Sequence, residues 1–188
     1  MKKIEALYIH IPFCDHICIY CDFYKMIASS EKINEYIDYL IKELIIKKDF
    51  FKDLKTIYIG GGTPSILSNE NLIKLLETIN NLININNIIE FTIEANPNDI
   101  TAEFIQTIKE YHVNRISLGV QSLNNNKLSF LNRNHNKDIV LKALKKLNEL
   151  NFDNISCDLI YGINFDDFNL IKEDIDILIQ NSVKHISC

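Results

Sequence analysis

The sequence predicts an α/β fold in which helices cover a parallel sheet, and three observations support this. Short, nearly continuous apolar segments alternate with longer segments in which apolar residues recur every three or four positions. This alternation is typical of parallel strands joined by right-handed helical crossovers. The length of 188 residues is short of the roughly 250 residues of a complete eight-stranded α/β barrel. An incomplete barrel and an open doubly wound sheet both fit the pattern.

The first half of the chain contains three predicted strands. Residues 4–11 form a strand that ends at Pro12, and residues 31–50 have helical apolar spacing. The second strand, residues 55–59, is followed by three consecutive glycines. Ser68 is the predicted N-cap of the next helix. The sequence then predicts a third strand over residues 88–95, closed by the breaker pair Asn96-Pro97.

The second half repeats the alternation and stops inside a strand. Thr101 is predicted to cap a helix that carries Phe104, Ile105 and Ile108. Further strands are predicted at residues 115–120 and 154–161, further helices at 139–150 and 170–178, and the start of a sixth strand at 183–188. We find no linker, so we expect residues 1–188 to be one domain that is incomplete at its C-terminal end.

Composition and charge restrict the class of protein. With 47% hydrophobic and 24% charged residues, the chain resembles a soluble globular domain and is not disordered throughout. A net charge of −5 offers nucleic acid no electrostatic attraction, so we expect no such partner. No apolar run reaches transmembrane length. Glu5 and His10 interrupt the first apolar stretch, and no cleavage site follows. We expect a cytoplasmic protein and leave contact with a membrane surface open.

Three of the five cysteines lie within eight residues, as Cys14-x-x-x-Cys18-x-x-Cys21. An odd number of cysteines argues against a disulfide framework. Three thiolates on one loop can converge on a soft-metal centre. A structural zinc site would need a fourth ligand, from His10 or His16. An iron–sulfur cubane fits three thiolates better, because one of its four irons then stays open to a substrate.

Other candidate residues follow the remaining predicted strands. In parallel α/β folds, ligands bind at the carboxyl ends of the strands. These ends carry Gly60-Gly61-Gly62-Thr63, then Glu94, then Gln121 and finally Asp158. Glycines in a loop can equally form a simple turn, whereas a carboxylate at a buried strand end is costly unless it is paired.

These motifs together resemble those of a known protein family. Its cysteine spacing is the signature of the radical S-adenosylmethionine superfamily. The longer string from Tyr8 to Phe23 is similar to the oxygen-independent coproporphyrinogen III oxidase family, and most similar to its heme chaperone HemW branch. Further matching segments are Gly60–Ser65, Ile93–Pro97, Arg115–Ser122, Leu131–His135 and Asp158–Gly162. The resemblance implies a partial, TIM-like (βα)6 barrel, truncated in the sixth strand, rather than an open doubly wound sheet.

The resemblance also implies cofactors. Cys14, Cys18 and Cys21 would hold a [4Fe–4S] cluster whose open iron chelates S-adenosylmethionine, and reductive cleavage would release a 5′-deoxyadenosyl radical. The residues implied to bind S-adenosylmethionine or to pack around the cofactors are Tyr8, Tyr20, Gly61, Gly62, Thr63 and Glu94. Gln121, Arg133 and Asp158 match positions that contact a second S-adenosylmethionine in the oxidase branch. Arg133 can equally form an ordinary ion pair on the surface. We interpret Cys157, which lies in an apolar strand, as a small buried hydrophobic residue.

One departure from the oxidase pattern distinguishes the two branches. The oxidase branch typically has another cysteine two residues after the third, where this sequence has Phe23. We therefore expect a chaperone that binds and transfers heme, and the alternatives are a coproporphyrinogen III oxidase and a zinc-stabilised or inactive domain. The implied partners are heme or a porphyrinogen and an electron donor of flavodoxin or ferredoxin type. Whether the chain is an enzyme stays undecided.

Overall fold

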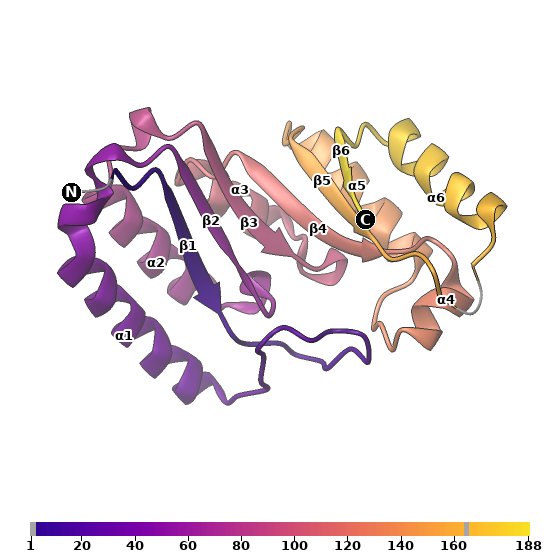
Figure 1. Cartoon of the computed structure of the whole chain (residues 1–188), viewed down its shortest axis with the longest axis horizontal. Coiled ribbons are helices and arrows are strands. Elements are labelled where there is room, and N and C mark those ends of the chain that lie inside the picture. The colour runs from indigo at the N-terminus through magenta and orange to yellow at the C-terminus, as the bar shows by residue number, and fades with distance from the viewer. Residues whose placement is uncertain (1–2, 164–165) are drawn as a thin grey trace.

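The computed structural model describes residues 3–163 and 166–188, so residues 1–2 and 164–165 of the expected domain lie outside the described residues. One parallel sheet joins six strands in sequence order. The strands are β1 (Ala6–Ile11), β2 (Thr56–Gly61), β3 (Glu90–Ala95), β4 (Arg115–Gln121), β5 (Ile155–Leu159) and β6 (His185–Ser187) (Figure 1). That all 188 residues form a single domain stays a prediction.

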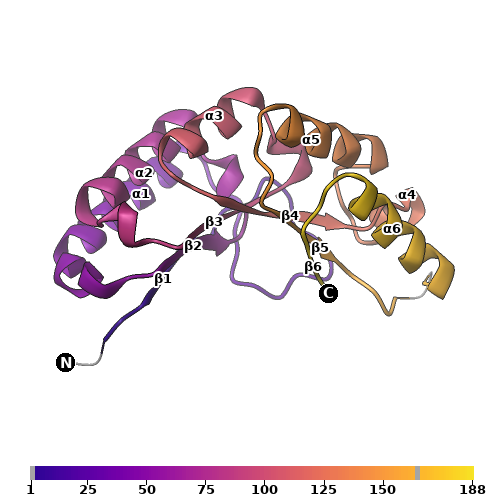
Figure 2. The same cartoon turned by 90° about the horizontal axis from the view of Figure 1, so that it is seen from above.

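Helices connect the strands and arch over one face of the sheet (Figure 2). They are α1 (Ser30–Lys47), α2 (Asn69–Leu82), α3 (Ala102–Glu110), α4 (Asn125–Phe130), α5 (Lys137–Glu149) and α6 (Phe168–Gln180). Among the described residues β1 and β6 do not pair with each other, so the sheet is open and the opposite face carries no helix. This arrangement confirms the predicted partial α/β barrel with parallel strands and outer helices.

Local sequence signals explain where the helices begin and which face they bury. The Ser68 hydroxyl accepts from the Asn71 amide at 3.3 Å, and the Thr101 hydroxyl accepts from the Phe104 amide at 3.0 Å, which confirms both predicted caps. The buried residues of α2 recur at helical spacing: Leu72, Leu75, Leu76 and Ile79. They pack with the apolar side chains of the strands into one core.

No helix among the described residues combines the length and the hydropathy needed to cross a bilayer.

The main differences from the sequence prediction concern the first helix and an additional short one. The first helix ends at Lys47 and continues as a 3₁₀ helix over Lys48–Asp53. Helix α4 was not predicted, because six residues are too few to show a period of 3.6. Its N-cap, Asn124, accepts from the Asn126 and Lys127 amides, but one asparagine among several neighbouring asparagines is a weak sequence signal.

Cys14, Cys18 and Cys21 lie between β1 and α1 on a long loop, which the sequence had indicated as loop (Figure 1). This loop folds back on itself, because the Met26 amide donates to the Pro12 carbonyl at 2.7 Å and the Cys14 amide donates to the Met26 carbonyl at 3.0 Å. Figure 2 shows the loop crossing the face of the sheet that the helices leave free.

A buried ion pair joins the loop after β5 to α4. The ammonium of Lys127 contacts Asp166, and their side chains are only 2% and 7% exposed. Asp166 also accepts from the Ile163 amide at 3.1 Å. A buried charge that loses its partner destabilises a fold strongly, whereas replacement of the whole pair by apolar residues is often tolerated.

We therefore expect Lys127→Met to lower the free energy of unfolding by roughly 3–5 kcal/mol. The double variant Lys127→Met with Asp166→Leu should recover most of that loss, because no buried charge then lacks a partner. Urea unfolding followed by circular dichroism measures both values. A double variant that is less stable than Lys127→Met would contradict this explanation.

Candidate functional site

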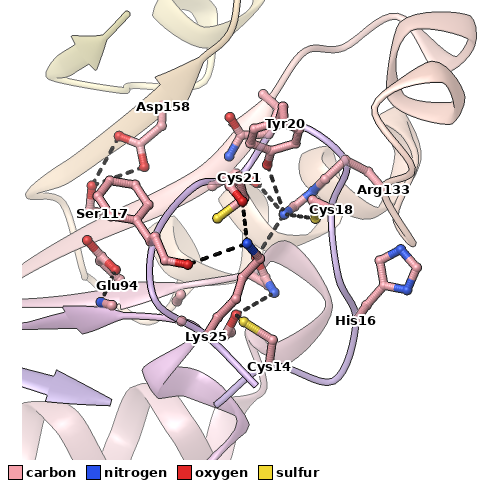
Figure 3. Close-up of a pocket in the computed structure, with 18 of the residues that line it drawn as sticks. Cys14, His16, Cys18, Tyr20, Cys21, Lys25, Glu94, Ser117, Arg133 and Asp158 are labelled. Atoms are coloured by element: carbon pink, nitrogen blue, oxygen red, sulfur yellow. Dashed lines mark hydrogen bonds between the residues drawn. The ribbon is translucent and has the colours of Figure 1, made fainter. Parts of the chain in front are cut away.

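A cavity of about 450 Å³ lies at the carboxyl edge of the sheet, between the strand ends and the loop after β1 (Figure 3). Most residues implicated by the sequence meet there, from five strands or their following loops: Cys14, Cys18, Tyr20, Cys21, Gly61, Gly62, Thr63, Glu94, Gln121, Arg133 and Asp158. Tyr8 is the exception. It lies farther back on β1, where its ring stacks on that of Tyr58 at 6.0 Å between centroids.

All three thiols of the Cys14-x-x-x-Cys18-x-x-Cys21 segment line this cavity. Cys14 is buried, Cys18 and Cys21 are partly exposed, and all three are free of disulfides. The Thr63 hydroxyl lies 3.5 Å from the Cys14 sulfur, and burial raises the pKa of that thiol. Thiols bind metal as thiolates, so a cationic centre in the cavity would compensate the cost of charging Cys14.

The donor set fits an iron–sulfur cluster better than a mononuclear zinc ion. Zinc needs four ligands that all lie about 2.0–2.3 Å from one point, and the described residues contain no group of three His, Cys, Asp or Glu side chains placed to share one ion. A cubane takes one thiolate per iron, so its thiols stand farther apart. Three thiols around a cavity suit that larger group.

Neither histidine considered as a fourth zinc ligand is directed at the thiols. The His10 ring is held at both nitrogens, with Nδ1 2.9 Å from the Tyr8 hydroxyl and Nε2 3.2 Å from the Tyr24 carbonyl. His16 Nε2 lies 2.6 Å from the Asn132 carbonyl, and Figure 3 shows its ring turned away from the cysteines. The zinc alternative therefore lacks a preorganised fourth ligand from these two residues.

The triple glycine permits close contact between β2 and the cysteine loop. The Gly62 amide donates to the Ile11 carbonyl at 2.8 Å, and the Thr63 amide donates to the Phe13 carbonyl at 2.7 Å. A Cβ on Gly62 would lie 2.5 Å from the Phe13 carbonyl oxygen and 3.0 Å from the Cys14 sulfur. Glycine is required here because any side chain would push the loop off the strand.

Glu94 occupies the floor of the cavity with two partners of its own. Its carboxylate accepts from the Tyr58 hydroxyl at 2.7 Å and from the Gly61 amide at 2.9 Å. A Cβ on Gly60 would lie 2.8 Å from the carboxylate, so this glycine makes room for it. Burial raises the pKa of Glu94, while the two donors oppose that shift. The sequence analysis noted that a buried carboxylate at a strand end is unfavourable unless it is paired, and these two donors provide the pairing.

Arg133 joins the cysteine loop to the strand ends, and it is not a surface ion pair. One guanidinium nitrogen donates to the Cys18 sulfur at 3.4 Å and to the Tyr20 hydroxyl at 3.3 Å. The other donates to the Asn96 side chain at 2.7 Å and to the Gly119 carbonyl at 2.9 Å (Figure 3). The planar fork of arginine can serve four acceptors at once, which lysine cannot do.

A second carboxyl, Asp158 of β5, lies on the same wall of the cavity as Glu94, with Ser117 of β4 between them. Asp158 accepts from the Ser117 hydroxyl at 3.2 Å, and burial raises the pKa of its carboxyl. Figure 3 shows Glu94, Ser117 and Asp158 on one side of the view and the three cysteines beside them, on the loop. The cavity therefore has thiols on one wall and hydrogen-bonding carboxyls on the other, which suits a ligand with both metal-binding and hydroxyl or amino groups.

Sequence reasoning missed four residues that shape the cavity. Tyr58 and Ser117 follow from strand alternation, since they project from neighbouring strands onto the face that carries Glu94. Asn96 was interpreted as part of a breaker pair and of a matching segment but was given no role, although it accepts from Arg133. Lys25 donates to the Cys21 carbonyl and closes the cysteine loop, and no periodicity could have revealed that contact.

Comparisons with known proteins agree with this site. The family model described as the radical SAM superfamily matches residues 8–178. The chain is similar to the heme chaperone HemW of Lactococcus lactis and to that of Bacillus subtilis. Each is 40% identical over 187 residues, and the alignments cover 100% and 98% of this chain but 49% of each relative. The chain thus spans about half the length of these curated relatives.

A solved structure has a similar fold. Coproporphyrinogen III oxidase from Escherichia coli, described as a radical SAM enzyme, superposes with a TM-score of 0.87 at 24% sequence identity. The superposition covers 98% of this chain and 43% of that one. At this identity the likeness concerns the fold, and it supports the open arrangement of six parallel strands with outer helices.

The contacts of Gly62 predict a specific loss of metal binding. Gly62→Ala places a methyl group against the Phe13 carbonyl and the Cys14 sulfur, so the cysteine loop must shift and we expect at least a several-fold drop in iron bound after anaerobic reconstitution. Gly162→Ala is the matched control, because it strains a backbone at φ +83° but meets no atom within 4 Å. Equal iron content in both variants would refute the prediction.

Proposed function

The chain belongs to the radical SAM superfamily, and from that premise we propose that it is a HemW-type chaperone that binds and transfers heme. The observation that carries the proposal is the placement of three thiols from one loop on a cavity that also contains Glu94 and Arg133. Membership of the superfamily implies a [4Fe–4S] cluster and S-adenosylmethionine. Heme is the finer part of the proposal, and its support is the similarity to two heme chaperones at 40% identity.

The cavity residues suit the two implied cofactors. Cys14, Cys18 and Cys21 would ligate the cluster, and the Arg133 guanidinium beside Cys18 would offset its negative charge. A bound cluster of this kind supplies an electron to S-adenosylmethionine. Backbone groups of Gly61, Gly62 and Thr63 would approach the methionine part of that ligand without obstruction by side chains.

The remaining cavity residues suit the polar groups of S-adenosylmethionine. The Glu94 carboxylate would accept hydrogen bonds from its hydroxyls, and its contacts with Tyr58 and Gly61 hold it in position for this. Tyr20 is fixed next to the cysteines by Arg133, so its ring would pack against the cofactors. Tyr8 would act less directly, through its contacts with Tyr58 and His10.

Exposed apolar side chains on the cysteine loop suit a flat apolar ring such as heme. Ile19, Phe23 and Tyr24 are 64%, 72% and 69% exposed, and Phe23 also borders the cavity. Contiguous exposed apolar residues often mark binding surfaces. Phe23 occupies the position at which the oxidase branch carries an additional cysteine, so the same residue favours the chaperone.

The second candidate is a coproporphyrinogen III oxidase. Gln121, Arg133 and Asp158 favour it, because all three positions border the same cavity and match those that contact a second S-adenosylmethionine in that branch. In either case we propose a cytoplasmic protein that receives electrons from a flavodoxin or a ferredoxin. Its ligand would be heme for the chaperone and a porphyrinogen for the oxidase.

The cofactor assignment predicts a spectroscopic result. After anaerobic reconstitution with iron and sulfide and reduction, the chain should give a paramagnetic cluster signal that shifts when S-adenosylmethionine is added. Cys18→Ala should lose that complete cluster, because one iron then lacks its thiolate, while Cys188→Ala should retain it. A complete cluster in Cys18→Ala would refute the ligand assignment.

Heme titration and product analysis separate the two functions. For a chaperone we expect the heme absorption band to shift on addition of the chain, and Phe23→Ser to weaken this binding because it removes exposed apolar surface. Incubation with coproporphyrinogen III, S-adenosylmethionine and a reductant should then yield no protoporphyrinogen IX. Formation of that product without heme binding would establish the oxidase instead.

A further inference from the structure

Gln121, the last residue of β4, has a left-handed backbone conformation, which is unfavourable for any residue with a Cβ atom. Its φ is +65°, although it is not a glycine. The Ser122 amide donates to the Val120 carbonyl at 2.8 Å across it, which makes Gln121 the centre of a three-residue γ-turn of the rare, strained kind. Strain of this type persists only where the surroundings enforce it, and it is concentrated at functional sites.

The turn determines where the Gln121 side chain lies. Between Leu118 and Gln121 the pairing of β4 with β5 shifts by one residue, so β4 carries a bulge. The Gln121 side chain folds over Gly119, where a Cβ would lie 3.0 Å from its amide nitrogen, and it borders the cavity. No side-chain hydrogen bond between described residues uses this amide, which leaves it available to a ligand.

Two segments hold the turn from opposite sides. His135, before α5, is 5% exposed, and its Nε2 lies 3.0 Å from the same Val120 carbonyl that receives the Ser122 amide. On the other side, Asp174 of α6 accepts from the Ser122 hydroxyl at 2.6 Å and from the Leu123 amide at 3.0 Å. Asp174 thus anchors the residues after the turn, and His135 anchors the carbonyl that begins it.

The His135 ring is a donor at this contact. Burial and the neighbouring Arg133 lower the pKa of His135 to about 4, so the imidazole is neutral near neutral pH. A carbonyl oxygen can only accept, so the proton of the neutral ring lies on Nε2. The other nitrogen, Nδ1, is buried and has no partner among the described residues.

We propose that His135 is a positioning residue that, by its hydrogen bond to Val120, keeps Gln121 in the γ-turn and its amide directed at the S-adenosylmethionine bound in the cavity. Without this donor the Val120 carbonyl loses one of its two partners. The turn can then relax, and the Gln121 amide is no longer held over Gly119 at the cavity. The inference rests on the proposed function for the identity of the ligand.

A matched pair of polar variants tests this role. His135→Gln places an amide nitrogen at the reach of Nε2 and should keep the hydrogen bond, whereas the shorter His135→Asn should lose it. For the cluster-loaded chain we expect the affinity for S-adenosylmethionine in equilibrium dialysis to fall roughly tenfold in His135→Asn, as for one lost hydrogen bond. His135→Gln should stay within about twofold of the unmodified chain.

The coupling to Gln121 separates positioning from general destabilisation. Gln121→Ala alone should weaken binding to a similar extent, and His135→Asn should cause no further loss in that background. Equal effects of His135→Asn in both backgrounds, or no effect in either, would overturn the inference.

A second measurement does not depend on the ligand. Hydrogen exchange of the Ser122 amide should be faster in His135→Asn than in His135→Gln, because the γ-turn opens more often. If the unmodified chain does not bind S-adenosylmethionine, the proposed function fails. The exchange measurement still tests whether His135 holds the γ-turn, because it needs no ligand. Equal exchange rates of the Ser122 amide in the two variants would overturn the role of His135.

Discussion

The guanidinium of Arg133 connects parts of the chain that are more than a hundred residues apart in sequence. It reaches Cys18 and Tyr20 on the loop after β1, Asn96 after β3 and the Gly119 carbonyl on β4. The loop has few buried apolar side chains of its own, so hydrogen bonds hold it over the sheet. They come from Arg133, from Asn132 and Asn134 on either side of it, and from the backbone pairing with the glycine segment. The position of the thiols relative to the strand ends depends on those contacts.

The free face of the sheet differs from the interior of a closed α/β barrel. Closed barrels fill their interior with layers of branched apolar side chains, whereas the face under the cysteine loop carries paired polar groups. Glu94 is bonded to Tyr58 and Asp158 to Ser117, which lowers the cost of burying each carboxyl. The apolar residues are instead collected between the sheet and the helices. An open sheet can therefore hold a polar cavity without losing its core.

The strained turn at Gln121 borders the same polar cavity. A φ of +65° at a residue other than glycine destabilises the fold. The buried side chains of His135 and Asp174, on two other segments, keep the backbone in this conformation. One of those partners, Asp174, lies on α6, the last helix of the sequence. The residues that line the cavity or anchor its turns therefore come from segments between β1 and α6.

The sequence by itself determined the order of the strands and of every α-helix except the short α4, the caps at Ser68 and Thr101, and the three thiols, because these depend on local periodicity and spacing. It also placed Glu94 and Asp158 at strand ends, since parallel strands bring those ends to one edge. Only the tertiary structure decided that Tyr8 stands outside the cavity, that Arg133 is bound to the loop, and that His135 reaches Val120. These are contacts between distant segments, and they depend on how the sheet curves and where the loop folds back, which no local pattern encodes.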